Sequence, residues 1–184
     1  LLLFALQDVN FEEIISIAWA ADDKHLVLQT GSPNWALLYW SWLAQNDTAL
    51  AWTEVEEAVT RVSTHPTNPS LLVTTGPNLL RQWSLVRDTK DSGSGPKAKL
   101  VEKELPLEGA ECAHTLGEAE EFTDHCWLVE KPKNDEPVEP KLLVGTSEGN
   151  LLFFQHGKLD HVMTDYWKDT VVPGPGGAAA SAAA

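Results

Sequence analysis

The sequence has very few cysteines, and few basic residues relative to acidic ones. Its 184 residues include only two Cys, Cys112 and Cys126. Small secreted domains usually depend on many disulfides, so this count excludes a disulfide scaffold and favours a reducing compartment. Lys and Arg number 13 against 27 Asp and Glu, which gives a formal net charge of −14. Nucleic acid and anionic lipid are held mainly by excess Lys and Arg, so we expect neither as a partner.

Long hydrophobic runs and recognisable catalytic motifs are also missing. The first apolar run stops at Leu6, which is too short for a membrane span or a signal segment. The sequence contains no phosphate-cradling glycine loop, no Gly-x-Ser-x-Gly elbow and no His-Glu-x-x-His. We therefore expect no enzyme activity, no cofactor and no membrane association. A protein partner of basic character fits the net charge, and its attraction would weaken with salt over a Debye length of about 8 Å.

The sequence does contain a repeated strand pattern. Apolar segments that end in an aromatic residue recur four times, and their aromatic ends are Phe4, Trp40, Trp83 and Phe154. Similar segments begin or end at three pairs of positions, and the two positions of each pair are 45 residues apart: 14 and 59, 26 and 71, and 31 and 76. WD-type propeller blades repeat at about 40–45 residues. We therefore expect the four aromatics to pack between repeats rather than to form a ligand cage.

The pattern predicts an all-β fold, a WD40-type β-propeller fragment of about three four-stranded blades plus one leading strand. The leading strand is expected at residues 1–6. The blade strands are expected at residues 14–19, 25–30, 35–42 and 48–55; at 59–64, 71–76, 78–86 and 99–105; and at 122–129, 142–144, 149–152 and 158–164. Insertions are expected at residues 88–97 and 131–140.

Two domain-level expectations follow from this pattern. Residues 1–168 form the partial propeller, and residues 169–184, rich in Pro, Gly and Ala, form a flexible linker or tail. Closed propellers need about 4–8 blades, so we expect further blades outside this sequence.

One stretch is strongly acidic and is a candidate docking site for a basic partner. Only Lys103 opposes its carboxylates. The alternative is a solvated loop with no binding role. The candidate residues are Glu102, Glu104, Glu108, Glu111, Glu118, Glu120, Glu121 and Asp124.

The other candidate cluster consists of Cys112, His114, His125 and Cys126. Cysteine sulfur and histidine nitrogen are ligands that zinc prefers, and structural zinc sites usually have four of them. However, the ligands of a zinc site usually come in pairs that are separated by several residues. Here one residue separates Cys112 from His114, and Cys126 directly follows His125. We therefore expect loop or core residues here rather than a metal site.

Two dipeptides point to a family. Trp40-Ser41 and Trp83-Ser84 stand where a WD repeat carries Trp-Asp, although the usual Gly-His pair is absent. Beyond the generic repeat, the chain resembles the WD-repeat region of the axonemal family of cilia- and flagella-associated protein 57. The segments that carry the resemblance are residues 14–19, 26–30, 37–42, 73–76 and 144–151.

This resemblance implies a structural scaffold of the ciliary or flagellar axoneme, a part of the cytoskeleton. Its implied partners are inner dynein arm components, which it would help to place, and other ciliary scaffold proteins. The alternative is a soluble WD-repeat adaptor that recruits partners to another cytoplasmic assembly. A propeller enzyme is a third possibility, which the lack of a convergent catalytic set disfavours.

Overall fold

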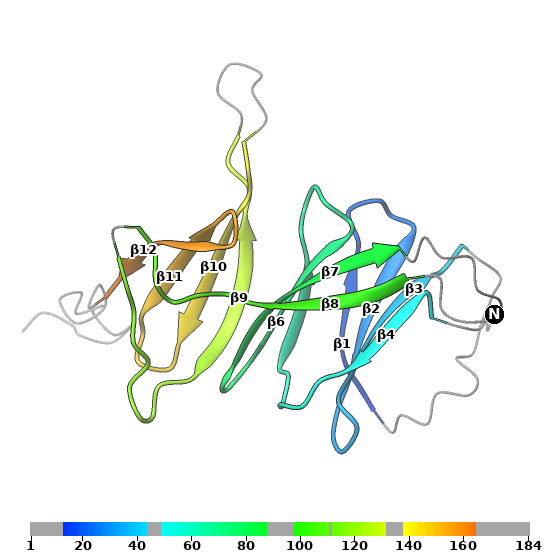
Figure 1. Ribbon diagram of the computed structural model, residues 1–184, viewed down its shortest axis with the longest axis horizontal. Helices are drawn as coiled ribbons and strands as arrows, with labels where there is room; N and C mark the ends of the chain where they lie inside the picture. The colour runs from blue at the N-terminus through cyan, green and yellow to red at the C-terminus, as the bar shows by residue number, and fades with distance from the viewer. Residues whose placement is uncertain (1–12, 44–48, 88–97, 111, 132–137, 165–184) are drawn as a thin grey trace, which may run out of the picture.

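Three four-stranded antiparallel sheets make up the described part of the chain (Figure 1). The structure is a computed structural model that describes residues 13–43, 49–87, 98–110, 112–131 and 138–164. Each sheet takes its four strands in chain order, as successive hairpins. The predicted leading strand with Phe4, the predicted tail at residues 169–184, and Glu111 lie outside the described residues. In the described part, no helix is long and apolar enough to cross a membrane.

We call the three sheets blades 1, 2 and 3. Blade 1 contains β1 (Ile14–Trp19), β2 (His25–Thr30), β3 (Ala36–Ser41) and β4 (Ala51–Glu54). Blade 2 contains β5 (Arg61–Thr64), β6 (Leu71–Gly76), β7 (Leu79–Arg87) and β8 (Ala98–Glu104). Blade 3 contains β9 (Phe122–Leu128), β10 (Lys141–Thr146), β11 (Leu151–Gln155) and β12 (Lys158–Met163). All twelve predicted blade strands are therefore found, with ends that differ by up to three residues.

The strand pairing corrects the predicted repeat alignment by one residue. Leu26 pairs with Trp40, Leu72 with Trp83, and Leu142 with Phe154, so these three pairs are equivalent in the three blades. The sequence offset of 45 had instead matched residue 26 with residue 71. The first connection of blade 1 spans residues 20–24, whereas that of blade 2 spans residues 65–70 and is one residue longer. A one-residue slip in a strand moves every side chain to the other face, so the correction decides which residues are buried.

The first hydrophobic core lies between blades 1 and 2. Leu37 and Tyr39 of blade 1 pack in it with Leu72 and Trp83 of blade 2, and all four are at most 2% exposed. The Tyr39 hydroxyl crosses the interface and donates a hydrogen bond of 2.8 Å to the carbonyl of Pro69. Burying a large side chain of this kind stabilises a fold by about 1.5–3 kcal/mol, so the two sheets depend on each other.

The second core lies between blades 2 and 3. Val73 and Leu80 present the opposite face of blade 2 to Leu142, Leu152 and Phe154 of blade 3. Blade 2 is thus a sheet buried on both faces, because neighbouring residues of a strand point to opposite sides. This explains why β6 reads as a continuous apolar and threonine run without polar alternation.

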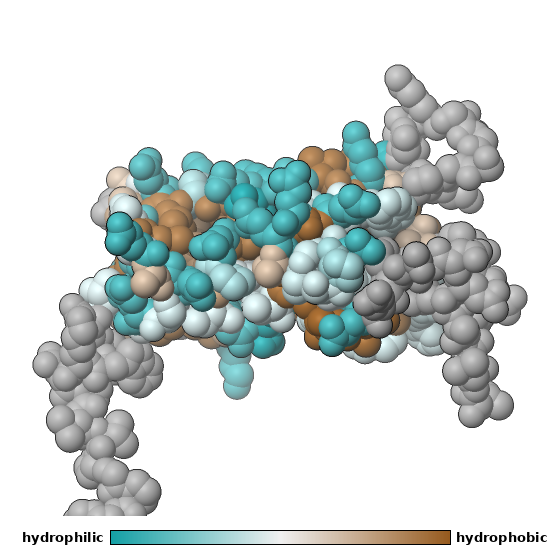
Figure 2. Space-filling view, turned by 90° about the horizontal axis from the view of Figure 1, so that it is seen from below, coloured by the Kyte–Doolittle hydropathy of each residue, from teal (hydrophilic) through white to brown (hydrophobic). Residues whose placement is uncertain are grey.

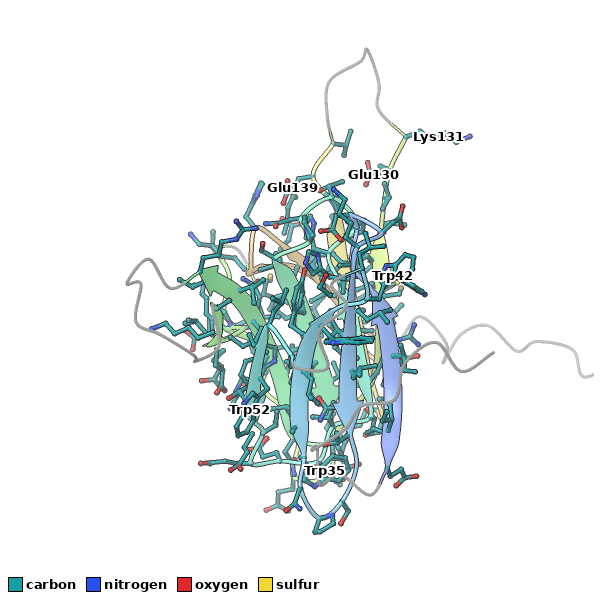
Figure 3. The ribbon with its side chains drawn as sticks, turned by 90° about the vertical axis from the view of Figure 1, so that its right-hand side faces the viewer. Trp35, Trp42, Trp52, Glu130, Lys131 and Glu139 are labelled. Carbon is teal, nitrogen blue, oxygen red and sulfur yellow. The ribbon has the colours of Figure 1, made fainter. Side chains whose placement is uncertain are left out.

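The face of blade 1 that points away from blade 2 carries several tryptophans. Leu38 and Trp40 lie on this face, because Leu37 and Tyr39 point into the first core. Trp52 pairs with Leu38 and is 52% exposed on the same face. Figure 3 views this face of blade 1, with Trp42 and Trp52 labelled. Among the described residues, no further sheet covers it.

A tight turn closes the last hairpin of blade 3. His156 and Gly157 connect β11 to β12 with φ of 53° and 70°. Two central residues in the left-handed region define a two-residue type I′ hairpin, whose twist matches that of the strands. The turn brings Gly157 beside Gln82 of blade 2, at one end of the junction between blades 2 and 3.

Candidate protein-interaction surface

Two of the predicted docking carboxylates are paired within the protein. Arg81 of β7 lies between Glu102 and Glu104 of the outer strand β8. Its Nε is 2.6 Å from Glu102 Oε1, and its Nη1 is 3.2 Å from Glu104 Oε1. One guanidinium therefore neutralises part of the charge of both groups. The sequence had suggested Lys103 as the opposing cation, but β8 turns alternate residues to opposite faces, and Arg81 on the neighbouring strand faces the two carboxylates.

Asp124 is also paired, and it lies in a polar groove. Its Oδ2 is 3.0 Å from Arg61 Nη1, so the ion pair joins blade 3 to blade 2. The two residues line a groove of about 380 Å³ along the first strands of all three blades, together with Ser16 of blade 1. Asp124 thus helps to hold neighbouring blades together at this groove.

Glu120 has to be removed from the candidate docking set, because it is buried. It is 4% exposed, and its carboxylate is 3.0 Å from His114 Nε2 and 2.8 Å from the Asn150 Nδ2 donor. The backbone N–H of Gly117 also donates to it. Burial alone would raise the pKa of Glu120, but these hydrogen bonds and one from Thr146 lower it to about 2. Glu120 is therefore an ionised group that organises the loop before β9.

Three exposed carboxylates remain without a cation. Glu108, Glu118 and Glu121 are exposed, and they have no ion pair within the described part of the chain. They lie on the segment between β8 and β9, part of which packs on blade 3 through a contact of Cys112 with the Leu159 carbonyl. Figure 2 shows that the lower surface of the molecule is mostly hydrophilic, with smaller hydrophobic patches. Among the described residues of the acidic stretch, these three are therefore exposed and have no competing ion pair, which makes them the candidates for contact with a basic partner.

The four residues considered for zinc have separate surroundings. His114 binds Glu120, and His125 lies between Ser63 and Thr75. Cys126 is exposed, because it follows His125 on a strand and points to the opposite face. In the described segments, no three His, Cys, Asp or Glu side chains converge as metal ligands would.

His125 is the centre of a buried network that joins blades 2 and 3. Its Nε2 is 2.6 Å from Ser63 Oγ, and its Nδ1 is 2.8 Å from Thr75 Oγ1. Trp127 Nε1 donates a hydrogen bond of 3.0 Å to the same Ser63 hydroxyl. Burial, aided by the charge of Arg61, lowers the pKa of His125 to about 4. The ring is therefore neutral at pH 7 and serves as a polar link within the interface.

The repeat aromatics occupy equivalent places. Trp83 lies in the core between blades 1 and 2, and its Nε1 donates a hydrogen bond of 2.8 Å to Thr74 Oγ1. Phe154 lies in the core between blades 2 and 3. Trp40, only 9% exposed, lies on the face of blade 1 that turns away from blade 2. All three point in the same direction along the row of blades, as equivalent residues of stacked repeats do.

Comparison with known proteins supports the fold but identifies no family. No protein-family model matches the sequence, and no curated protein matches it. Among solved structures, the chain is similar to the β-propeller domain of Cps50 (Swd1) from Myceliophteria thermophila. The TM-score is 0.54 at 14% identity, over 82% of this chain. The chain spans only 41% of the length of that propeller. The three sheets are thus a fragment of a WD40-type β-propeller, as predicted.

Proposed function

We propose that the chain is a non-enzymatic scaffold that binds other proteins through the surface of its blades. The observation that carries this proposal is the division of its acidic residues. Glu102, Glu104 and Asp124 form ion pairs with arginines of the same chain at its surface, whereas Glu108, Glu118 and Glu121 form no ion pair with any residue that the structure describes. Unpaired carboxylates on a chain of net charge −14 attract a basic protein surface.

The finer proposal is that this scaffold belongs to the ciliary or flagellar axoneme and helps to place inner dynein arms. It is supported by the resemblance of strand segments, among them residues 37–42 and 144–151, to the family of cilia- and flagella-associated protein 57. The propeller fold agrees with that family's WD-repeat region. Inner dynein arm components and other ciliary scaffold proteins are the proposed partners.

Fractionation of ciliated cells tests this placement. The intact protein should remain with axonemes after detergent removes the membrane, and it should be released as salt is raised, because charge contacts are screened. A pool that is entirely soluble after detergent treatment would contradict the axonemal role. That result would favour a soluble adaptor that recruits partners to another cytoplasmic assembly.

A further inference from the structure

A pocket of about 300 Å³ lies where blades 2 and 3 meet. Its apolar wall is formed by Trp127, Leu142 and Phe154 of blade 3. Its polar lining comes from His65 and Gln82 of blade 2 and from Glu139, just before β10. Figure 3 shows Glu139 at the upper end of the molecule. This volume is at the lower end of the range for small-ligand sites, so it fits one long side chain.

The aromatic wall is held in place before any ligand arrives. Trp127 donates its indole N–H to Ser63 Oγ at 3.0 Å, which fixes the ring from one side. His65 packs against it edge-on, with ring centroids 4.6 Å apart. A tryptophan fixed in this way offers its electron-rich surface to a cation without losing further side-chain freedom.

The tautomer of His65 directs a donor toward Glu139. Its Nδ1 accepts hydrogen bonds from the backbone N–H groups of Thr67 and Asn68 at 3.3 and 3.1 Å. The ring proton is therefore on Nε2, which lies 3.5 Å from Glu139 Oε1. Burial lowers the pKa of His65, so the ring is neutral at pH 7 and the charge of Glu139 is not cancelled. At 3.5 Å the contact is weak, and the carboxylate can accept further hydrogen bonds.

Gln82 adds a free polar group to the pocket. Within the described residues, its side-chain amide has no hydrogen-bond partner. An amide can both donate and accept, so it can bind the backbone of an extended peptide. Lys103 Nζ lies beside Gly157 at another part of the lining. A ligand cation is therefore expected at Glu139, away from that ammonium group.

We propose that this pocket binds the side chain of an arginine from a basic segment of a partner protein. The guanidinium would pair with Glu139 and stack on Trp127, and its methylene stem would contact Leu142 and Phe154. A planar guanidinium meets both requirements, because it pairs with carboxylates in a fork and stacks on aromatic rings. This inference rests on the proposed role as a protein-binding scaffold, and it adds the chemical group that one site recognises.

A peptide titration tests the pocket directly. The intact protein, labelled with ¹⁵N at its tryptophan indoles, is titrated with acetyl-Gly-Arg-Gly-amide and with the same peptide carrying citrulline or lysine. The arginine peptide should shift the Trp127 indole signal and bind about tenfold more tightly than the citrulline peptide, which has a similar shape but no charge. It should also bind more tightly than the lysine peptide, because an ammonium group cannot pair in a fork.

Two variants that each remove one negative charge distinguish binding in the pocket from general electrostatic attraction. Glu139→Gln should weaken binding of the arginine peptide about tenfold. Glu130→Gln should change it less than twofold, because Glu130 lies on the same loop but pairs with Lys141 at 3.2 Å and does not line the pocket.

Three results would overturn the assignment: equal affinity for the arginine and citrulline peptides, equal affinity for the arginine and lysine peptides, or equal losses in the two variants. None of them would alter the retention of the protein on axonemes, which tests the scaffold role separately.

Discussion

Trp83 shows how much a single residue contributes to the interface between blades. It is 2% exposed, and its indole donates to Thr74. Trp83→Ala removes the ring from the core between blades 1 and 2, which should lower the free energy of unfolding by about 3–5 kcal/mol. Chemical denaturation of the intact protein measures this. Trp83→Phe, which keeps most of the ring but loses the hydrogen bond, is the matched control and should cost much less. An unchanged unfolding curve for Trp83→Ala would mean that the ring is not packed between blades.

His125 makes the stability of the protein depend on pH. Its pKa is about 4 in the folded state and 6.5 in an unfolded chain, so the unfolded state binds more protons between these values. Stability is therefore fully present above about pH 6.5 and is lost as pH falls toward 4. We expect a loss of about 2 kcal/mol between pH 7 and pH 5, measured by denaturation at each pH.

The matched variant for this effect is His125→Gln. It should be less stable at pH 7, because the amide cannot reproduce both contacts with Ser63 and Thr75. Its stability should also change less between pH 7 and pH 5. Glu120, with a pKa of about 2, loses its contribution only below about pH 4.5 and so does not affect this window. An equally steep pH dependence in the variant would assign the effect to other groups, such as His65.

At the scale of strands, the sequence predicted what local patterns control. Apolar and β-branched runs, separated by Gly, Pro and Asp, located all twelve blade strands. The one-residue shift of β6 relative to β2 was not predicted, because a hydrophobic pattern does not show that the connection at residues 65–70 is one residue longer than its counterpart in blade 1. The pocket and the His125 network could not be predicted, since Ser63, Thr75 and His125 are distant in sequence and meet only when blades 2 and 3 pack. The pairing of Arg81 with two glutamates similarly depends on strand register.

Two glycines that look equivalent in the sequence differ in the structure. A Cβ on Gly76, at the end of β6, would lie 1.8 Å from the backbone oxygen of Ala58. On Gly31 it would meet only side-chain atoms, the flexible carboxylate end of Glu13 at 2.9 Å and Ile15 Cγ2 at 3.0 Å. Gly76→Ala should therefore destabilise the protein by about 3 kcal/mol, whereas Gly31→Ala should cost under about 1 kcal/mol. Thermal unfolding of the two variants compares them, and equal costs would contradict the close approach of β6 to the segment before β5.

At the scale of the whole molecule, the three blades form a fragment of a β-propeller. The face of blade 1 with Trp40 and Trp52 corresponds to faces that are covered by a neighbouring blade in blades 2 and 3. Charge is distributed unevenly over the rest of the surface. Asp124 joins blade 3 to blade 2 through Arg61, and Glu102 and Glu104 pair with Arg81 within blade 2, whereas Glu108, Glu118 and Glu121 face solvent with no ion pair to another described residue. We assign partner binding to the carboxylates that have no such ion pair.

The most direct test of the account measures how much intact protein stays on demembranated axonemes in rising salt. A variant with Glu108, Glu118 and Glu121 changed to Gln is compared with one in which Glu102, Glu104 and Asp124 are changed to Gln. Both lose three charges, but only the first loses the unpaired carboxylates. We predict that the first variant is released at clearly lower salt than the wild-type protein, and that the second is retained nearly as well as the wild-type protein. Equal release of the two variants, or retention that does not depend on salt, would contradict it.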